Sequence, residues 1–263
     1  MSIQSFKPDI MEQALILEFH NKSILDKITT APSSTNGAKA IFNRVGGGSV
    51  KEYTGTVDYD NITSTPVEMV FDKKNYFAIQ LDDVDAVQAK ADTMQPVVED
   101  LALQVAEAVE KQVLADAVAK VSPDMKITKE SMLPSDAYDL VVDLGIKLGQ
   151  KKVPVANRAV VCNNEFLQQM AKDDRFARNF TILEDGLVDG ASINGMKIAV
   201  SENVPQGKVI ALHKSAVGFA TQLDDIEALR LEGAFADAIR GLNVHGDVVL
   251  RPEAIAVLEY VLA

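Results

Sequence analysis

The chain has 263 residues, 47% of them hydrophobic, and a formal net charge of −12 at pH 7. This length can bury a substantial core and permits one large domain or two small ones. The acidic balance argues against a nucleic-acid-binding surface, because neutralising phosphates requires clustered lysines and arginines. The single cysteine, Cys162, excludes an intrachain disulfide and is typical of a chain made in a reducing compartment.

The sequence carries no recognisable export or membrane-spanning signal. Its N-terminal residues lack a basic region followed by a long apolar stretch. No segment approaches the roughly 20 consecutive apolar residues that a spanning helix needs. We therefore expect a soluble product without a membrane partner.

The first 80 residues predict an arm followed by an extended hairpin. Residues 1–30 predict a short amphipathic helix that starts near Pro8, which we interpret as an arm. Residues 31–66 hold β-branched and aromatic residues but too few apolar ones for two buried faces, which predicts a projecting hairpin with a flexible glycine run at 46–48. Residues 67–80 alternate more regularly and predict two strands joined by a turn at 72–75, at the base of this projection.

The strongest periodic signal predicts a long helix over residues 83–120. Its apolar residues recur every three or four positions, while acidic residues, among them Glu110, are assigned to the other faces. At ~1.5 Å per residue such a helix would extend roughly 55 Å and act as a strut. Pro96 predicts a bend or a break within it. Either Asp82 or Asp83 is expected to cap its start.

The remainder of the chain predicts an α/β lobe and a set of late strands. Helices are expected at 134–149 and 164–178, and strands at 158–162, 196–201 and 209–213. From Gln222 onward, apolar segments predict strands separated by turns at Gly233, Gly241 and Gly246. The last of these strands closes the chain at its C-terminus.

No residue pattern predicts catalysis or ligand binding. His20, His213 and His245 lack metal-ligand spacing, and Cys162 has no cysteine or histidine close in sequence. The glycine run lacks the Lys-Ser/Thr pair of a phosphate-binding loop. The acidic residues within 223–227 are expected on a solvated turn, because a divalent ion needs several converging oxygens. Neither a nucleophile elbow nor a catalytic triad is recognisable, so we predict no catalytic residue, metal or cofactor.

The order of these elements resembles the N-arm, E-loop, spine helix, A-domain and P-domain of tailed-bacteriophage major capsid proteins with the Hong Kong 97-type fold. The run FDKKNYFAIQLDDVDAVQAKADTMQPVVEDLALQVAEAVEKQVLAD resembles the family's passage from a core strand through an acidic turn into the spine helix. The segments INGMKIAVSENVP, ALHKSAVGFATQLDDIEALR and GLNVHGDVVLRPEAIAVL are similar to its later motifs. The resemblance extends from about Phe6 to the C-terminus.

The resemblance implies an α+β fold in four parts. These are an N-terminal arm (1–30), an E-loop hairpin (31–66), a P-domain with the spine helix (67–130 and 222–263) and an A-domain (131–221). It also implies a non-enzymatic major capsid protein that assembles with itself, as pentamers and hexamers, into an icosahedral shell around double-stranded DNA. A portal, and scaffolding or decoration proteins, are further implied partners. The chain would be made in the host bacterial cytoplasm and reside in the virion capsid.

Contacts between subunits are expected from the arm and the hairpin, because one chain must bond neighbours at fivefold and quasi-sixfold positions. The candidate interface residues are Tyr53, Thr56, Val57 and Tyr59 in the hairpin, and Phe6, Ile10 and Leu17 in the arm. Some relatives crosslink their subunits by a lysine-to-asparagine isopeptide bond. Residues 233–237, where we would seek the acceptor, contain no Asn. We therefore predict no such crosslink.

Two other functions remain as alternatives. An encapsulin-like nanocompartment shell protein would share the fold but enclose cargo enzymes, and a hydrophobic cargo groove facing the lumen would favour it. A small α/β enzyme would instead be favoured by a concave pocket with a strongly perturbed carboxylate.

Overall fold

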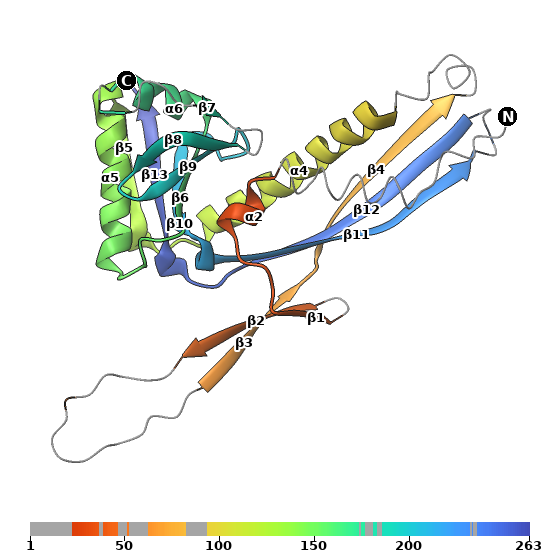
Figure 1. Ribbon diagram of the computed structural model, residues 1–263, viewed down its shortest axis with the longest axis horizontal. Coiled ribbons are helices and arrows are strands. Elements are labelled where there is room, and N and C mark those ends of the chain that lie inside the picture. Colours follow the sequence, from red (N-terminus) through yellow and green to blue (C-terminus); the bar gives the residue numbers. More distant parts are fainter. Residues whose placement is uncertain are drawn as a thin grey trace.

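The computed structural model consists of an α/β lobe, a long helix lying along a three-stranded sheet, and a smaller sheet that projects from the place where these meet (Figure 1). The structure describes residues 23–36, 39–46, 52, 63–82, 94–173, 175–176, 181–182, 186–231, 233 and 236–263. None of the helices in these ranges is long and apolar enough to span a bilayer.

A seven-stranded mixed sheet forms the lobe, in the order β5-β13-β10-β6-β9-β8-β7. Its strands are β5 (Lys126–Met132), β6 (Arg158–Cys162), β7 (Thr181–Ile182), β8 (Leu187–Ile193), β9 (Met196–Val200), β10 (Lys208–His213) and β13 (Ile255–Leu262). The central strands β6, β10 and β13 are buried along most of their length, as their continuous apolar runs require. The helix α5 (Pro134–Gln150) packs against β5, β10 and β13, and α6 (Asn164–Ala171) packs against α5.

The predicted helix over 164–178 was too long at its C-terminal end. The helix α6 stops at Ala171 because the following residues form a turn. In this turn the Asp173 carboxylate accepts a hydrogen bond from the backbone N–H of Arg175 at 2.9 Å, and the Asp173 carbonyl accepts one from Phe176. Such local bonds from an aspartate compete with helical ones.

The second sheet is antiparallel and has the order β11-β12-β4. Its strands are β11 (Val217–Arg230), β12 (Ala236–Val249) and β4 (Lys73–Asp82). The turn predicted at Gly233 is confirmed, but those predicted at Gly241 and Gly246 are wrong, because both glycines lie inside β12. Both are sites of close approach: a Cβ at Gly241 would lie 2.4 Å from the Phe77 ring, and one at Gly246 would lie 2.5 Å from the carbonyl oxygen of Val70.

The acidic residues expected on a solvated turn also belong to this sheet. Asp224, Asp225 and Glu227 lie within β11, where the pairing with β12 shifts register between Asp224 and Glu227. A β-bulge of this kind adds a residue to one strand and bends it without ending it. The interruption in the apolar pattern therefore marks a bulge and not a turn.

The strut helix α4 spans Met94–Ala119 and continues through Pro96 without a break. The expected helix start at residue 83 and a cap by Asp83 lie outside the described residues, whereas Asp82 is the last residue of β4. Glu110 was assigned to a face other than the apolar one, and this was wrong, because its side chain is buried among the apolar residues of the helix.

The projecting sheet has the order β1-β2-β3 and is antiparallel throughout. Its strands are β1 (Ser34–Asn36), β2 (Lys39–Gly46) and β3 (Thr63–Val70). The expected turn at 72–75 between paired strands is wrong, because β3 and β4 join different sheets and only residues 71–72 connect them. Met69 packs in a small core with Ala40 and Phe42, while Phe77 joins the main core.

The closing strand was expected to accompany β11 and β12, since residues 222–263 were assigned to one part. Instead β13 pairs with β10 and β5 in the sheet of the lobe. A short 3-10 helix, Pro252–Ala254, redirects the chain between β12 and β13. The apolar run from Ile255 to Leu258 is buried on both faces, which only the lobe's sheet provides.

Candidate assembly surfaces

Among its described side chains, the projecting sheet has an apolar core only at its root. Ala40, Phe42 and Met69 are buried there, against partly buried residues that include Ala220, Val248 and Leu250 of the body. On the opposite face, Lys39 and Glu68 form an exposed ion pair at 2.6 Å. A small sheet of few strands without its own core has little independent stability. The body therefore determines the direction in which this sheet projects.

The root is held by a close contact between a ring and a glycine. A Cβ at Gly218 would lie 2.6 Å from the Phe42 ring, so the ring packs directly on the backbone of β11. Next to it, Thr30 forms a parallel bridge to Gly218. The Thr30 N–H donates to the Val217 carbonyl at 2.9 Å, and the Phe219 N–H donates to the Thr30 carbonyl at 3.1 Å. Two segments that lead toward the hairpin are thus fixed to one strand.

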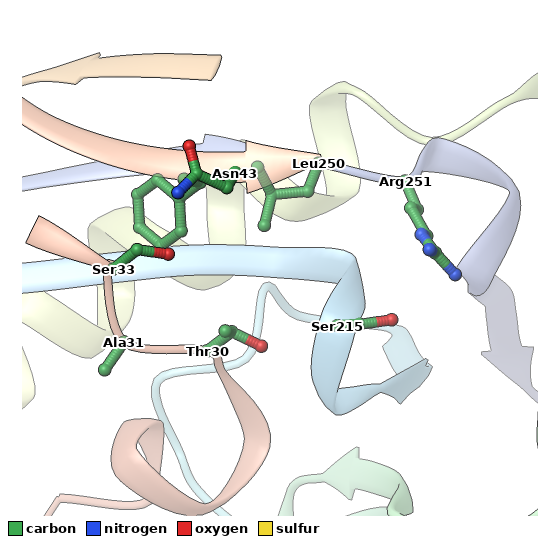
Figure 2. Close-up of a pocket in the computed structure, with 8 residues that line it drawn as sticks. Thr30, Ala31, Ser33, Asn43, Ser215, Leu250 and Arg251 are labelled. Carbon is green, nitrogen blue, oxygen red and sulfur yellow. The ribbon is translucent and has the colours of Figure 1, made fainter. Parts of the chain in front are cut away.

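A small pocket opens beside this root (Figure 2). It has a volume of about 160 Å³ and is lined by Thr30, Ala31, Ser33, Phe42, Asn43, Ser215, Leu250 and Arg251. Figure 2 shows Arg251 at one end and Ala31 and Ser33 at the other. Pockets that bind cofactors or drug-sized ligands are usually about 300 Å³ or larger. This pocket can hold one side chain and not a cofactor.

A buried carboxylate anchors the first described residues of the chain to the body. Glu110 of α4 is 4% exposed. Its carboxylate accepts hydrogen bonds from the Ile24 N–H at 2.9 Å, the Ser201 hydroxyl at 2.9 Å and the Asn203 amide at 3.1 Å. The short helix α2 (Leu25–Ile28) follows directly, with both of its end residues buried. Glu110 therefore joins the strut, the lobe and the segment that leads from the expected arm.

Sequence reasoning missed this role of Glu110, although a signal existed. Ala106, Val113 and Ala117 are buried at helical spacing on either side of it. A glutamate at a position of the apolar stripe is a candidate for a buried, hydrogen-bonded acceptor, because a buried carboxylate must be paired.

The lobe exposes apolar side chains at both ends of α5. Leu133 and Val261 are 53% and 63% exposed, and Ala263 donates a backbone hydrogen bond to Met132 between them. Near the other end, Ile146 and Val155 are 48% and 58% exposed. Single exposed apolar residues are common on surfaces, so these pairs are candidate contact points and no more.

An arginine joins α5 and α6 on the lobe surface. Arg175 forms ion pairs with Asp139 at 2.5 Å and Asp173 at 2.6 Å, and its guanidinium lies 4.6 Å from the centre of the Tyr138 ring. The hydrogen bonds from Arg175 lower the pKa of Asp173 to about 2. This cluster keeps the two helices together on the outside of the lobe.

The candidate interface residues Tyr53, Thr56, Val57 and Tyr59, and Phe6, Ile10 and Leu17, all lie outside the described residues. The structure therefore does not bring them together or separate them. Around that gap it describes strands β2 and β3, which pair from Lys39 with Val70 to Gly46 with Thr63. Antiparallel pairing on both sides of 47–62 confirms the hairpin as far as these strands extend.

The described residues offer little for catalysis. Within them, no three His, Cys, Asp or Glu side chains gather where a metal ion could bind. The Cys162 thiol is buried, and burial raises its pKa to about 12, so it is not a reactive thiolate. His213 accepts a hydrogen bond from the Ser215 N–H at 3.1 Å and caps the short helix Lys214–Ala216. His245 is buried between α4 and the second sheet.

Comparisons with known proteins give matches among solved structures alone. No family model matches the chain, and no curated protein matches it by sequence. A structure from Mycobacterium phage Che8 is 23% identical, covers 85% of each chain and has a TM-score of 0.61. The capsid structure of the cyanophage P-SCSP1u is 17% identical, covers 92% of this chain and 89% of that one, and has a TM-score of 0.65.

A third solved structure bears on the alternative shell function. The virus-like particle from Pyrococcus furiosus is 14% identical, covers 95% of this chain and 98% of that one, and has a TM-score of 0.62. Together these likenesses show the fold: the chain is α+β and has the Hong Kong 97-type fold of phage capsid structures. The predicted fold class is confirmed.

Proposed function

We propose that this chain is the major capsid protein of a tailed bacteriophage, a non-enzymatic subunit that assembles with itself into an icosahedral shell around double-stranded DNA. The observation that carries the proposal is a match to capsid structures over 85% or more of both chains. A second support is the projecting sheet, whose described residues pack on the body at its root alone.

The proposed division of labour follows the four parts. Residues 1–30 act as the arm, 31–66 as the E-loop hairpin, 67–130 with 222–263 as the P-domain and spine helix, and 131–221 as the A-domain. Strand β13 is the exception, because it pairs in the lobe's sheet. The anchoring of Ile24 by Glu110 supports an arm that leaves the body at a fixed point.

In this proposal the arm and the hairpin bond neighbouring subunits in pentamers and hexamers. The proposed contact residues remain Tyr53, Thr56, Val57 and Tyr59 in the hairpin, with Phe6, Ile10 and Leu17 in the arm. A portal, and scaffolding or decoration proteins, would be the other partners. The chain would be made in the host bacterial cytoplasm and end in the virion capsid.

The net charge of −12 supports confinement of DNA by the shell wall instead of binding by the subunit. Duplex DNA binding by the purified subunit at physiological salt, with a steep salt dependence, would contradict this part of the proposal. We expect no binding above background in a filter-binding titration.

The test is negative-stain electron microscopy of the protein expressed alone and with its neighbouring genes. We expect closed shells, or rings of five and six copies of one polypeptide. A variant lacking residues 43–62 provides the control, because it keeps the packed root but removes the tip of the hairpin. Intact shells from that variant would refute the role of the hairpin. Small oligomers from the full chain under every condition would refute the shell function.

A cellular nanocompartment shell is the second candidate, since the match to the virus-like particle covers 98% of that chain. The two functions differ in what the shell encloses. Nuclease-protected DNA in particles made with the neighbouring genes would support the capsid, and a single co-purified enzyme inside the shell would support the nanocompartment.

A further inference from the structure

One part of the seam between α4 and the β11-β12-β4 sheet is polar, although it is buried. Further along the same sheet face, Phe77 and Ile79 pack in or against the apolar core. Throughout the described residues, six buried side-chain polar atoms lack a hydrogen-bond partner, and all six belong to α4, β4 or β12. They are Asn75 Nδ2, Gln112 Oε1, Asn243 Nδ2, Nδ1 and Nε2 of His245, and Asp247 Oδ2. Buried polar atoms are nearly always paired, so their gathering in one interface requires a cause.

Strand register places these residues on one surface. His245 pairs with Lys73 and Asn243 pairs with Asn75 across the β12–β4 ladder. Alternate residues of a strand point to the same face, so positions 243, 245 and 247 share a face with 73 and 75. This face meets α4, because Lys73 Nζ donates a hydrogen bond to Asp116 at 2.6 Å and another to Asp247. Figure 1 shows α4 lying along this sheet.

The unpaired atoms are a mixed set of donors and acceptors. The amide nitrogens of Asn75 and Asn243 donate, and the oxygens of Gln112 and Asp247 accept. Burial, and then the charge of Lys73, lower the pKa of His245 to about 4, so at pH 7 the neutral ring offers one donor and one acceptor. A metal ion or an anion would satisfy only one kind of atom. Water satisfies both kinds.

Solvent can reach the seam from the side. An open groove of about 730 Å³ runs along it. The groove is lined by Lys73, Lys74, Ala108, Lys111, Gln112, Ala115 and Asp116. Lys73 and Gln112 therefore border both the open groove and the buried seam. Water molecules that enter here have polar partners on the helix and on the sheet.

The seam contrasts with the rest of the helix surface. Elsewhere on its surface, α4 buries apolar residues such as Val109, Val113 and Ala117. Interdigitated apolar side chains resist sliding, because close packing leaves few alternative arrangements. Water-bridged polar contacts can re-form after a small displacement at nearly the same energy. Where Lys73 and water hold it, α4 can shift by small amounts relative to the sheet, about the apolar contacts that Phe77 and Ile79 make further along the same face.

We infer that the seam binds ordered water and acts as a slip joint, by which one chain adjusts the angle between its strut and its sheet. The inference rests on the proposed function, since a shell subunit must fit fivefold and quasi-sixfold positions with one sequence. The charged groups that face the joint are Lys73 and Asp247 on the sheet, Asp116 and Lys120 on α4, and Asp72 before β4.

The test replaces the orphaned groups by apolar ones from either side of the seam. His245→Leu removes the buried ring on β12, and Gln112→Met removes the amide on α4 while keeping its shape. An apolar side chain that replaces a buried polar group together with the water that bridges it can be nearly neutral or stabilising, as when both partners of a buried contact are replaced. We expect the thermal midpoint of each variant to be unchanged or to rise by roughly 2–4 °C. Gln80→Leu, on the exposed face of β4, is the matched control and should change neither stability nor assembly.

Assembly provides the second readout, by electron microscopy of particles from each variant. We expect the double variant His245→Leu/Gln112→Met to form tubes, sheets or irregular particles, because a dry seam holds the strut in one position. Uniform closed shells like those of the unaltered chain would overturn the slip joint and leave the shell function intact. A fall in midpoint of more than about 4 °C in both single variants would overturn the water-filled seam. If the unaltered chain forms no shells, the proposed function fails, and the thermal midpoints still decide whether the seam is hydrated.

Discussion

Removing the Glu110 carboxylate should loosen three parts of the subunit together. Glu110→Ala deprives the Ile24 N–H, the Ser201 hydroxyl and the Asn203 amide of their shared acceptor. A buried donor left unpaired costs about 1–3 kcal/mol, and some of the three will find water. We expect a loss of about 3 kcal/mol in the free energy of unfolding. Glu110→Gln keeps one acceptor oxygen and should lose about half as much.

Urea unfolding of the unassembled subunit, followed by far-UV circular dichroism, measures these losses. The matched control is Glu107→Ala, three residues earlier on the exposed face of α4, which should change stability by less than about 0.5 kcal/mol. Limited proteolysis reports separately on the entry of the chain, because cleavage near residue 23 should become faster when Ile24 is released. Equal stability of Glu110→Ala and Glu107→Ala would refute the anchoring role.

Three further predictions concern other buried contacts. Arg158 is 4% exposed and donates hydrogen bonds to the carbonyl oxygens of Gly145, Val153 and Pro154. Arg158→Met should therefore destabilise the lobe by about 2–4 kcal/mol in the free energy of unfolding measured in urea. A loss below about 1 kcal/mol would contradict this. Gly218→Ala should lower the free energy of unfolding by about 1–3 kcal/mol, because the new Cβ meets the Phe42 ring. In a double-mutant cycle, adding Phe42→Leu should restore much of this loss. Losses that simply add in the double variant would exclude a clash between the two residues. The pKa of His245 is lowered from 6.5 to about 4, so the unfolded chain binds a proton on this side chain at a higher pH than the folded chain does. The contribution of neutral His245 to the free energy of unfolding is therefore fully present above about pH 6.5 and falls by roughly 3 kcal/mol as the pH drops to 4. In urea unfolding at a series of pH values, His245→Leu should flatten this slope.

The elements with one dominant physical cause could be predicted from the sequence. The strut helix follows from apolar spacing, and its described part ends at Ala119, one residue from the expected end. The strands β6, β9 and β10 follow from short apolar runs bounded by turns, with ends within one residue of those expected. Their buried faces are decided by side chains that lie close together in the sequence.

The errors arose where a distant segment decides the local structure. Gly241 and Gly246 were assigned to turns, whereas a strand accepts them because Phe77 and the Val70 carbonyl occupy the space of their missing side chains. The sequence around each glycine contains no trace of the partner that approaches it. The placement of β13 beside β10 has the same origin, because pairing over long separations leaves no local pattern.

The polar seam escaped prediction for a different reason: polarity at a buried position is ambiguous in a sequence. Glu110 and Arg158 are buried charges that neutral donors or carbonyl oxygens satisfy completely, and such fully paired groups hold one geometry. His245 and Asn243 are buried at the same level but retain unpaired atoms. The pattern of polar residues is alike in the two cases, and only the partners differ. Fixed joints at Glu110 and Arg158, with a less constrained one beside His245, would let a shell subunit keep its strut and lobe in one geometry while the sheet beside the strut adapts to each position.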